Sequence, residues 1–419
     1  MVTIGVVTAI ANPALEAVVI RGLGQSAEDA QVVRRCVEMT DVLAIAASGQ
    51  ARAVVVGDNL AGLDADVVAR IAAHGVVPIA LAEPGLSWPR AYQFPVVLDA
   101  TSDPQTLARE IIGAARAGLD QHLALRPAGA ADRGAAAPPA GRGRVIAVWG
   151  PAGAPGRSTV ALGIADELAR RDLATLLVDA DPYGGSQAAM LGLLDESPGI
   201  AAACRAAAAG TLDPMSLART CLQVGAHLRV LTGISRSDRW PELRPSSIEV
   251  LLEAARALAA VTVLDCGFSI EEDEELAYDT LAPRRNGATT TALQLADEIL
   301  LVCGCDPVSV ARGVRAAQDL RVLIPAATPR IVVNKVRSTV LDGDAETQLA
   351  EAFGRYAALA PSHLLPHDVK ACDAALLRGR LLAEAAPSSG LRRSLSTLAA
   401  TLVPEPSGPP QRRRRRTHR

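Results

Sequence analysis

The sequence predicts an α/β protein built from two parallel sheets, and three features of the chain indicate this class. Short apolar runs alternate with helix-like segments along most of the 419 residues, which is the pattern of parallel strands joined by helices. A low-complexity stretch at residues 126–143, RPAGAADRGAAAPPAGRG, interrupts this alternation. A glycine-rich stretch at residues 148–163, VWGPAGAPGRSTVALG, follows it and joins an apolar run directly to a helix-like one.

Two segments of biased composition divide the chain, which is long enough for two domains. Residues 123–143 are rich in Ala, Pro, Gly and Arg, the composition of a flexible linker. Residues 404–419, PEPSGPPQRRRRRTHR, have the composition of a disordered tail. We therefore expect an N-terminal domain at residues 1–122 and a second domain at residues 144–403.

Before the linker, five short apolar runs predict a five-stranded, flavodoxin-like sheet. Helices are expected between the runs, near residues 12–23, 37–49 and 64–74, and after the last run near residues 104–119. The predicted strands are residues 3–7, 30–33, 52–57, 76–81 and 94–98. Strict alternation of strand and helix predicts a parallel sheet with helices on both faces.

The strand count and a length of about 120 residues make this part resemble the response-regulator receiver domain. A receiver carries acidic residues after its first strand and a phosphate-accepting aspartate after its third. Here the first strand runs into TAIA at residues 8–11, and Gly57 stands in the acceptor's place. Asp58 is one position further on, where the side chain points to the other side of the strand. We interpret the domain as a pseudo-receiver; a flavodoxin-like structural domain without signalling ancestry is the alternative.

After the linker, six apolar runs predict the strands of a doubly wound, mostly parallel sheet. They are near-continuously apolar, as expected of strands buried on both faces. Ligands of such sheets bind at the carboxyl ends of the strands. The predicted strands are residues 145–150, 175–181, 228–233, 261–267, 298–304 and 330–336.

The carboxyl ends of three of these strands carry the residues of a phosphate site. The first ends in the glycine-rich loop and opens a helix, whose free N–H groups and dipole favour phosphate. The second ends in Asp179 and Asp181, and the fourth in Asp265. Acidic residues facing a phosphate loop suit a bound Mg²⁺ and an attacking water. The combination predicts a nucleotide site.

With these motifs, residues 145 to about 403 resemble the deviant Walker-A ATPases of the MinD/ParA superfamily, which have the P-loop NTPase fold. The family's loop, Lys-Gly-Gly-x-Gly-Lys-[Ser/Thr]-[Ser/Thr], aligns with residues 152–159, its DxDxQ-like segment with residues 179–185, and its Walker-B aspartate with Asp265. The resemblance implies ATP and Mg²⁺ as cofactors. It implies nucleotide contacts from Gly153, Ala154, Pro155, Gly156, Arg157, Ser158, Thr159 and Asn334, metal ligands Ser158, Asp179 and Asp265, and Asp181 as the catalytic residue that orients water.

The loop also departs from the family pattern. Ala152 replaces the signature lysine that reaches across a nucleotide-sandwiched dimer, and Arg157 replaces the second lysine. A planar guanidinium is larger than the ammonium that normally lies on the phosphates. Pro155 removes a backbone N–H, and Ala154 stands where glycine would tolerate a positive φ. We therefore expect nucleotide binding with at most slow ATP hydrolysis.

The C-terminal part resembles one branch of this superfamily, called CpaE or TadZ, in which a receiver-like domain precedes the ATPase. The matching segments are residues 364–399, DRWPELRP at 238–245 and DCGFSIEEDEEL at 265–276, which look most like actinobacterial CpaE-like proteins. The resemblance implies a homodimer that positions a Flp/Tad-type pilus or secretion machinery. A septum-site-determining regulator of cell division and a pseudo-ATPase scaffold acting by protein contacts alone remain alternatives.

Charge and targeting signals bear on partners and location. The net charge is −3, and the last eight residues contribute six arginines and no acids. The rest of the chain is therefore acidic, which argues against a specific nucleic-acid partner. The tail either attracts an anionic membrane surface weakly or only aids solubility. No secretory signal or long apolar run is present, so we expect a cytoplasmic protein, placed peripherally at the inner face of the membrane, the cell pole or the septum if the tail targets it.

Overall fold

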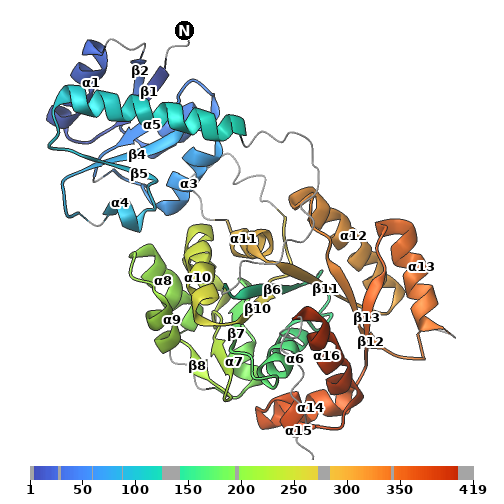
Figure 1. The fold of residues 1–419 in the computed structure, drawn as a ribbon. Coiled ribbons are helices and arrows are strands. Elements are labelled where there is room, and N and C mark those ends of the chain that lie inside the picture. Colours follow the sequence, from blue (N-terminus) through green and yellow to red (C-terminus); the bar gives the residue numbers. More distant parts are fainter. Residues whose placement is uncertain are drawn as a thin grey trace, which may run out of the picture.

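The computed structural model describes residues 4–26, 30–58, 60–86, 88–124, 142–193, 198–271, 284–340 and 344–403. The chain forms two parallel sheets, each with helices on both faces (Figure 1). The α/β class predicted from the sequence is thus confirmed. The predicted tail and most of the predicted linker, residues 125–141, lie outside the described residues.

The N-terminal sheet has the order β2-β1-β3-β4-β5 with all pairs parallel, which is the flavodoxin-like doubly wound order. All five predicted strands are present. Their bounds are β1 (Ile4–Ala9), β2 (Ala30–Arg35), β3 (Ala53–Val56), β4 (Val77–Ala82) and β5 (Val96–Asp99).

Helices cover both faces of this sheet because successive strand residues point to opposite sides. Val6 packs with α1 and α5, and its neighbour Val7 packs with α2 and α3. The helices are α1 (Pro13–Gln25), α2 (Met39–Ala47), α3 (Ala65–Ala73), α4 (Trp88–Ala91) and α5 (Pro104–Ala124). The short α4 was not predicted, and α5 extends beyond its predicted end.

The C-terminal sheet has eight strands in the order β13-β12-β11-β6-β10-β7-β9-β8. All pairs are parallel except β8 with β9. The six predicted strands are present, and the two edge strands, β8 and β13, were not predicted. The bounds are β6 (Arg144–Trp149), β7 (Thr175–Ala180), β8 (Leu222–Gln223), β9 (Leu228–Leu231), β10 (Val261–Cys266), β11 (Glu298–Gly304), β12 (Arg330–Val336) and β13 (Pro361–Pro366).

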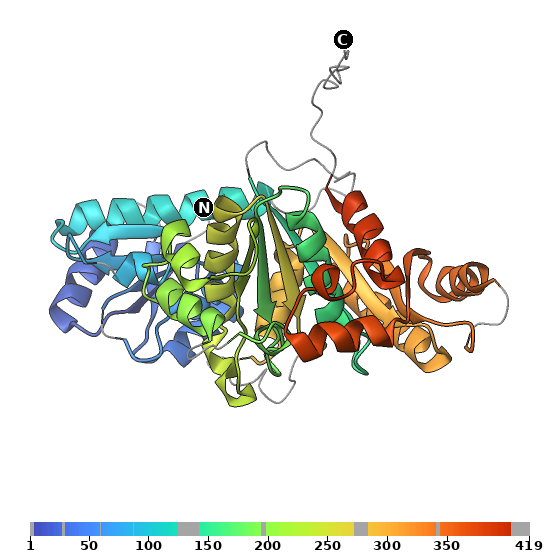
Figure 2. The ribbon, with the colours of Figure 1, turned by 90° about the horizontal axis from the view of Figure 1, so that it is seen from below.

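Helices cover both faces of this second sheet, with strands between the two helical layers (Figure 2). One face carries α6 (Arg157–Ala169), α7 (Gln187–Met190), α14 (Val369–Arg378), α15 (Leu382–Ala385) and α16 (Gly390–Leu402). The other carries α8 (Gly199–Ala208), α9 (Pro214–Thr220), the 3₁₀ helix η1 (Ser237–Glu242), α10 (Pro245–Leu258), α11 (Gly287–Leu295), α12 (Pro307–Leu323) and α13 (Ala345–Ala357). No helix within the described ranges is long and apolar enough to cross a membrane.

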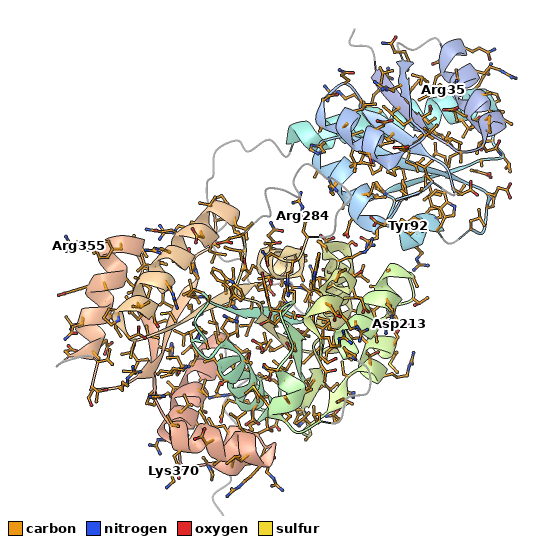
Figure 3. The ribbon with its side chains drawn as sticks, turned by 180° about the vertical axis from the view of Figure 1, so that it is seen from behind. Arg35, Tyr92, Asp213, Arg284, Arg355 and Lys370 are labelled. Carbon is orange, nitrogen blue, oxygen red and sulfur yellow. The ribbon has the colours of Figure 1, made fainter. Side chains whose placement is uncertain are left out.

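The two sheets meet where the first turns of α3 and α10 face each other. Arg244, at the start of α10, forms an ion pair with Asp64, and the backbone N–H of Ser246 donates to Asp66 Oδ1 at 2.9 Å. Because the N-cap residue of α10 makes no side-chain cap bond of its own, Asp66 caps this helix from the other sheet. Arg284 lines the hollow of about 80 Å³ beside this contact (Figure 3).

Candidate functional site

The glycine-rich loop, residues 150–156, connects β6 to α6 at the centre of the C-terminal sheet. β6 lies between β11 and β10. The strands β7 to β10 lie on one side of it and β11 to β13 on the other, so the loop lies at the topological switch point where doubly wound sheets bind ligands. Gly153, Ala154 and Gly156 have positive φ values of 107°, 51° and 97°. Ala154 thus has the left-handed backbone that glycine would adopt without strain, at a cost on the order of 1 kcal/mol.

Gly156, at the end of the loop, has no room for a side chain. It is the N-cap residue of α6, and a Cβ added there would lie 2.4 Å from Nδ2 of Asn334. That Nδ2 donates to the Pro155 carbonyl at 2.9 Å. Asn334, predicted to contact the base, therefore also holds the end of the loop to β12.

Arg157, predicted to contact phosphate, is turned back under the loop. Its NH1 donates to the carbonyls of Gly150 and Pro151, both at 3.1 Å. Its NH2 lies 3.7 Å from Asp181 Oδ2, and the guanidinium carbon lies 5.9 Å from the ring centre of Phe268. The guanidinium thus binds the inside of the loop and one of the predicted acids.

Ser158 and Asp265 meet at the buried base of the loop. Asp265 is 1% exposed, and interaction with the Ser158 side chain acts to lower its pKa. The amide Nε2 of Gln187, which is fully buried, donates to Asp265 Oδ2 at 2.8 Å and to the Ser158 carbonyl at 3.1 Å. Burial raises the pKa of Asp265, while these hydrogen bonds and the charge of Arg157 oppose the rise.

Asp179 has a different set of partners. Its Oδ2 accepts from the backbone N–H groups of Ser186 and Gln187, at 2.7 and 2.9 Å. Burial and the charge of Asp265 raise its pKa. Asp179 therefore anchors the segment that follows β7. Of the three predicted metal ligands, Ser158 and Asp265 are bridged by the side-chain amide of Gln187.

Asp181 lies beside the guanidinium of Arg157, with its side chain 17% exposed. Its Oδ1 accepts from the backbone N–H of Tyr183 at 2.8 Å. Burial raises the pKa of Asp181, and the bond from Tyr183 and the charges of Arg157 and Arg285 counteract this. The Tyr183 ring stacks on Phe268 with ring centres 4.4 Å apart, and Arg285 covers it at 4.2 Å. An aromatic and cationic stack thus borders Asp181.

The loop forms one wall of a cleft of about 510 Å³, a volume typical of small-molecule sites. Residues 366–369, which run from the end of β13 to the start of α14, line it as well. The predicted loop residues that line it are Ala154, Pro155, Gly156, Arg157, Ser158 and Thr159, and Asn334 and Lys335 of β12 line it as well. Gly153 lies outside the lining, beside Arg312 of α12.

The oxygen atoms at the base of the loop fit Mg²⁺, which prefers oxygen ligands and is commonly held by one or two carboxylates together with nucleotide phosphates. Beside the bridged residues Ser158 and Asp265, the buried Oδ1 of Asp179 and Oε1 of Gln187 have no hydrogen-bond partner. Within the described residues, no three His, Cys, Asp or Glu side chains gather to hold a metal.

Sequence reasoning missed two polar side chains of the site, Gln187 and Lys335. Gln187 lies eight residues after Asp179 and beyond the predicted segment at residues 179–185. Its contacts to Ser158 and Asp265 arise only from folding. Lys335 directly follows Asn334, and this adjacency was the one signal available in the sequence.

Among known proteins, the chain is similar to several solved structures. No family model and no curated protein matches the chain. Among solved structures, it is similar to a ParA family ATPase from Chlorobium tepidum, at 20% identity over 61% of this chain and 98% of that one, with a TM-score of 0.49. It is also similar to the cell division ATPase MinD of Pyrococcus furiosus, at 17% identity over 62% and 98% with a TM-score of 0.47. The septum site-determining protein MinD of Pyrococcus horikoshii, complexed with Mg-ADP, gives 15% identity over 62% and 95% with a TM-score of 0.47.

Proposed function

We propose that the protein binds ATP with Mg²⁺ in the cleft beside the glycine-rich loop, as a MinD/ParA-like nucleotide-binding protein. The observation that carries this proposal is the loop itself. It lies at the switch point of a doubly wound sheet, leads into a helix N-terminus, and has Asp265 linked to the Ser158 carbonyl by the buried amide of Gln187. This combination is the arrangement that phosphate and a hard cation require.

Each residue of the site would have a separate role in binding or hydrolysis. The backbone N–H groups at the start of α6 bind phosphate oxygens. Ser158 and Asp265 hold Mg²⁺, which supplies positive charge to the phosphates when bound. Asp181, oriented by the N–H of Tyr183, positions an attacking water. Hydrolysis is slow because the guanidinium of Arg157 is engaged by two loop carbonyls and by Asp181.

Calorimetry of the full chain with a non-hydrolysable ATP analogue and Mg²⁺ tests this function. We expect saturable binding by the wild-type protein. Asp181→Ala should keep most of this affinity, because Asp181 binds no phosphate in the proposed arrangement, and should abolish any slow release of phosphate from ATP. A folded wild-type protein without detectable binding at millimolar nucleotide would instead favour the scaffold that acts by protein contacts alone.

We propose further that the two sheets belong to a pseudo-receiver domain at residues 1–122 and an ATPase domain at 144–403, joined by the linker. In the CpaE and TadZ branch that the sequence resembles, such a protein forms a nucleotide-linked homodimer and positions a Flp/Tad-type pilus or secretion machinery. A role in septum placement is the second candidate within the same superfamily. A fluorescent fusion viewed in cells separates them: foci that follow the secretion machinery support the first role and foci at division sites the second.

The N-terminal domain should not be phosphorylated by a small phosphodonor. Gly57 lies against Ile10 so closely that a Cβ on Gly57 would be 3.0 Å from Ile10 Cγ2, so an apolar side chain fills the space where an acceptor carboxylate would need room. We expect no label on residues 1–122 after incubation with acetyl phosphate and Mg²⁺. A label that Asp58→Ala removes would show a working receiver and refute the pseudo-receiver interpretation.

A further inference from the structure

Lysine is rare in this chain, and one of its lysines lies in the cleft. Of the 42 lysine and arginine residues, only Lys335 and Lys370 are lysines. Lys335 lines the cleft, and Lys370 is exposed on α14 (Figure 3). A guanidinium is a wide planar fork, whereas an ammonium is a compact charge with three donors. A lysine at the cleft of an arginine-rich protein therefore calls for a specific explanation.

An irregularity of β12 directs Lys335 toward the phosphate loop. The register between β12 and β13 shifts between Val333 and Val336, and such irregularities commonly re-aim side chains. Within the shift, Lys335 has a φ of 60°, a left-handed backbone that is strained for lysine. Its Nζ donates to the Ala154 carbonyl at 2.8 Å. The ammonium of Lys335 is thus held at the Ala154 carbonyl of the glycine-rich loop.

The other cations near the loop are already engaged or face elsewhere. Arg157 donates to two loop carbonyls and lies beside Asp181. Arg312 of α12 reaches the carbonyl of Ala152 at 3.4 Å, but it lines a separate hollow of about 220 Å³ and not the cleft. Lys335 uses one of its three N–H donors on Ala154, which leaves donors and a full charge for a ligand in the cleft.

We propose that Lys335 is the phosphate-binding cation of this site, delivered from strand β12 in place of the loop lysines that Ala152 and Arg157 replace. The inference rests on the proposed nucleotide binding and adds the residue that recognises the charge of a nucleoside di- or triphosphate. Its contact would be to the β- and γ-phosphates, so it discriminates nucleotides by the number of phosphates they carry.

The test compares AMP, ADP and a non-hydrolysable ATP analogue by calorimetry on the full chain with Mg²⁺. Lys335→Gln retains a donor for the Ala154 carbonyl but removes the charge. We expect its affinity for the ATP analogue to fall on the order of 10- to 100-fold, the size of a lost charge-assisted hydrogen bond, with AMP affinity nearly unchanged. Lys335→Arg should recover part of the loss. Lys370→Met, a change at the other lysine, should bind all three ligands as the wild type does.

Two results would overturn this inference. One is an equal loss of affinity for AMP and the ATP analogue in Lys335→Gln, which would mean that Lys335 only supports the loop. The other is unchanged affinity for all three ligands. Failure of the proposed function itself would be recognised separately, since the wild-type protein would then bind none of them. Thermal unfolding of each variant monitors folding, and Lys335→Arg carries the comparison with the wild type if Lys335→Gln does not fold.

Discussion

Replacing Gly150 with alanine is expected to lower the free energy of unfolding by about 3 kcal/mol, the upper range for overpacking a core. A Cβ at this position would lie 2.0 Å from the Val302 carbonyl oxygen and 3.0 Å from its carbonyl carbon. Val302 belongs to β11, whose backbone is paired with β6 up to Trp149. The clash is between two neighbouring backbones, so no side-chain rotation can relieve it. Denaturant unfolding of the purified variant measures the change.

Gly354→Ala is the matched control for this prediction. Gly354 lies in α13, a helix that packs on the same sheet. A Cβ there would have no atom within 4 Å. Alanine in a helix interior is favoured over glycine by roughly 0.5–1 kcal/mol, so this variant should be slightly more stable than the wild type. Equal stability of the two alanine variants would refute the steric argument at Gly150.

Substitution of Arg157 by alanine is expected to weaken binding of the ATP analogue on the order of 10- to 100-fold, equivalent to about 1.5–3 kcal/mol for hydrogen bonds that involve a charge. The variant leaves the carbonyls of Gly150 and Pro151 without their side-chain donor and Asp181 without its cation. The loop then loses its support from below. Calorimetry with Mg²⁺ measures the affinity.

Arg157→Lys refines this second prediction. A single ammonium is compact and lacks the planar fork of arginine, so we expect it to keep the attraction to Asp181 while supporting the two carbonyls less well, with an intermediate loss of affinity. Unchanged affinity in Arg157→Ala would contradict the role assigned to the guanidinium.

The strands of both sheets could be predicted wherever burial on two faces leaves an apolar run. The exceptions are the edges of the larger sheet. β13 begins and ends in proline and contains His363, and β8 has only two residues. An edge strand is paired on one side only and tolerates proline and polar residues, so neither segment carries the apolar pattern of a central strand.

The site was predictable as far as it depends on the order of residues along the chain. The glycine-rich loop and the acids at the strand ends are local motifs, and the structure places them at the carboxyl ends of the central strands β6, β7 and β10. The partners of Asp179, Gln187 and Lys335 depend instead on how separate segments pack. A register shift in β12 and the turn after β7 determine where these side chains point, and no spacing in the sequence records either.

The contact between the two halves of the described chain caps the N-terminus of α10 with a side chain of α3. Asp66, from the first turn of α3, supplies the acceptor that the first turn of α10 lacks. In a fragment that begins at residue 142, the Ser246 N–H would have to bind water in place of Asp66. A partner protein that offered a carboxylate to the Ser246 N–H would have to displace Asp66, so binding at this helix end requires the contact between α3 and α10 to open.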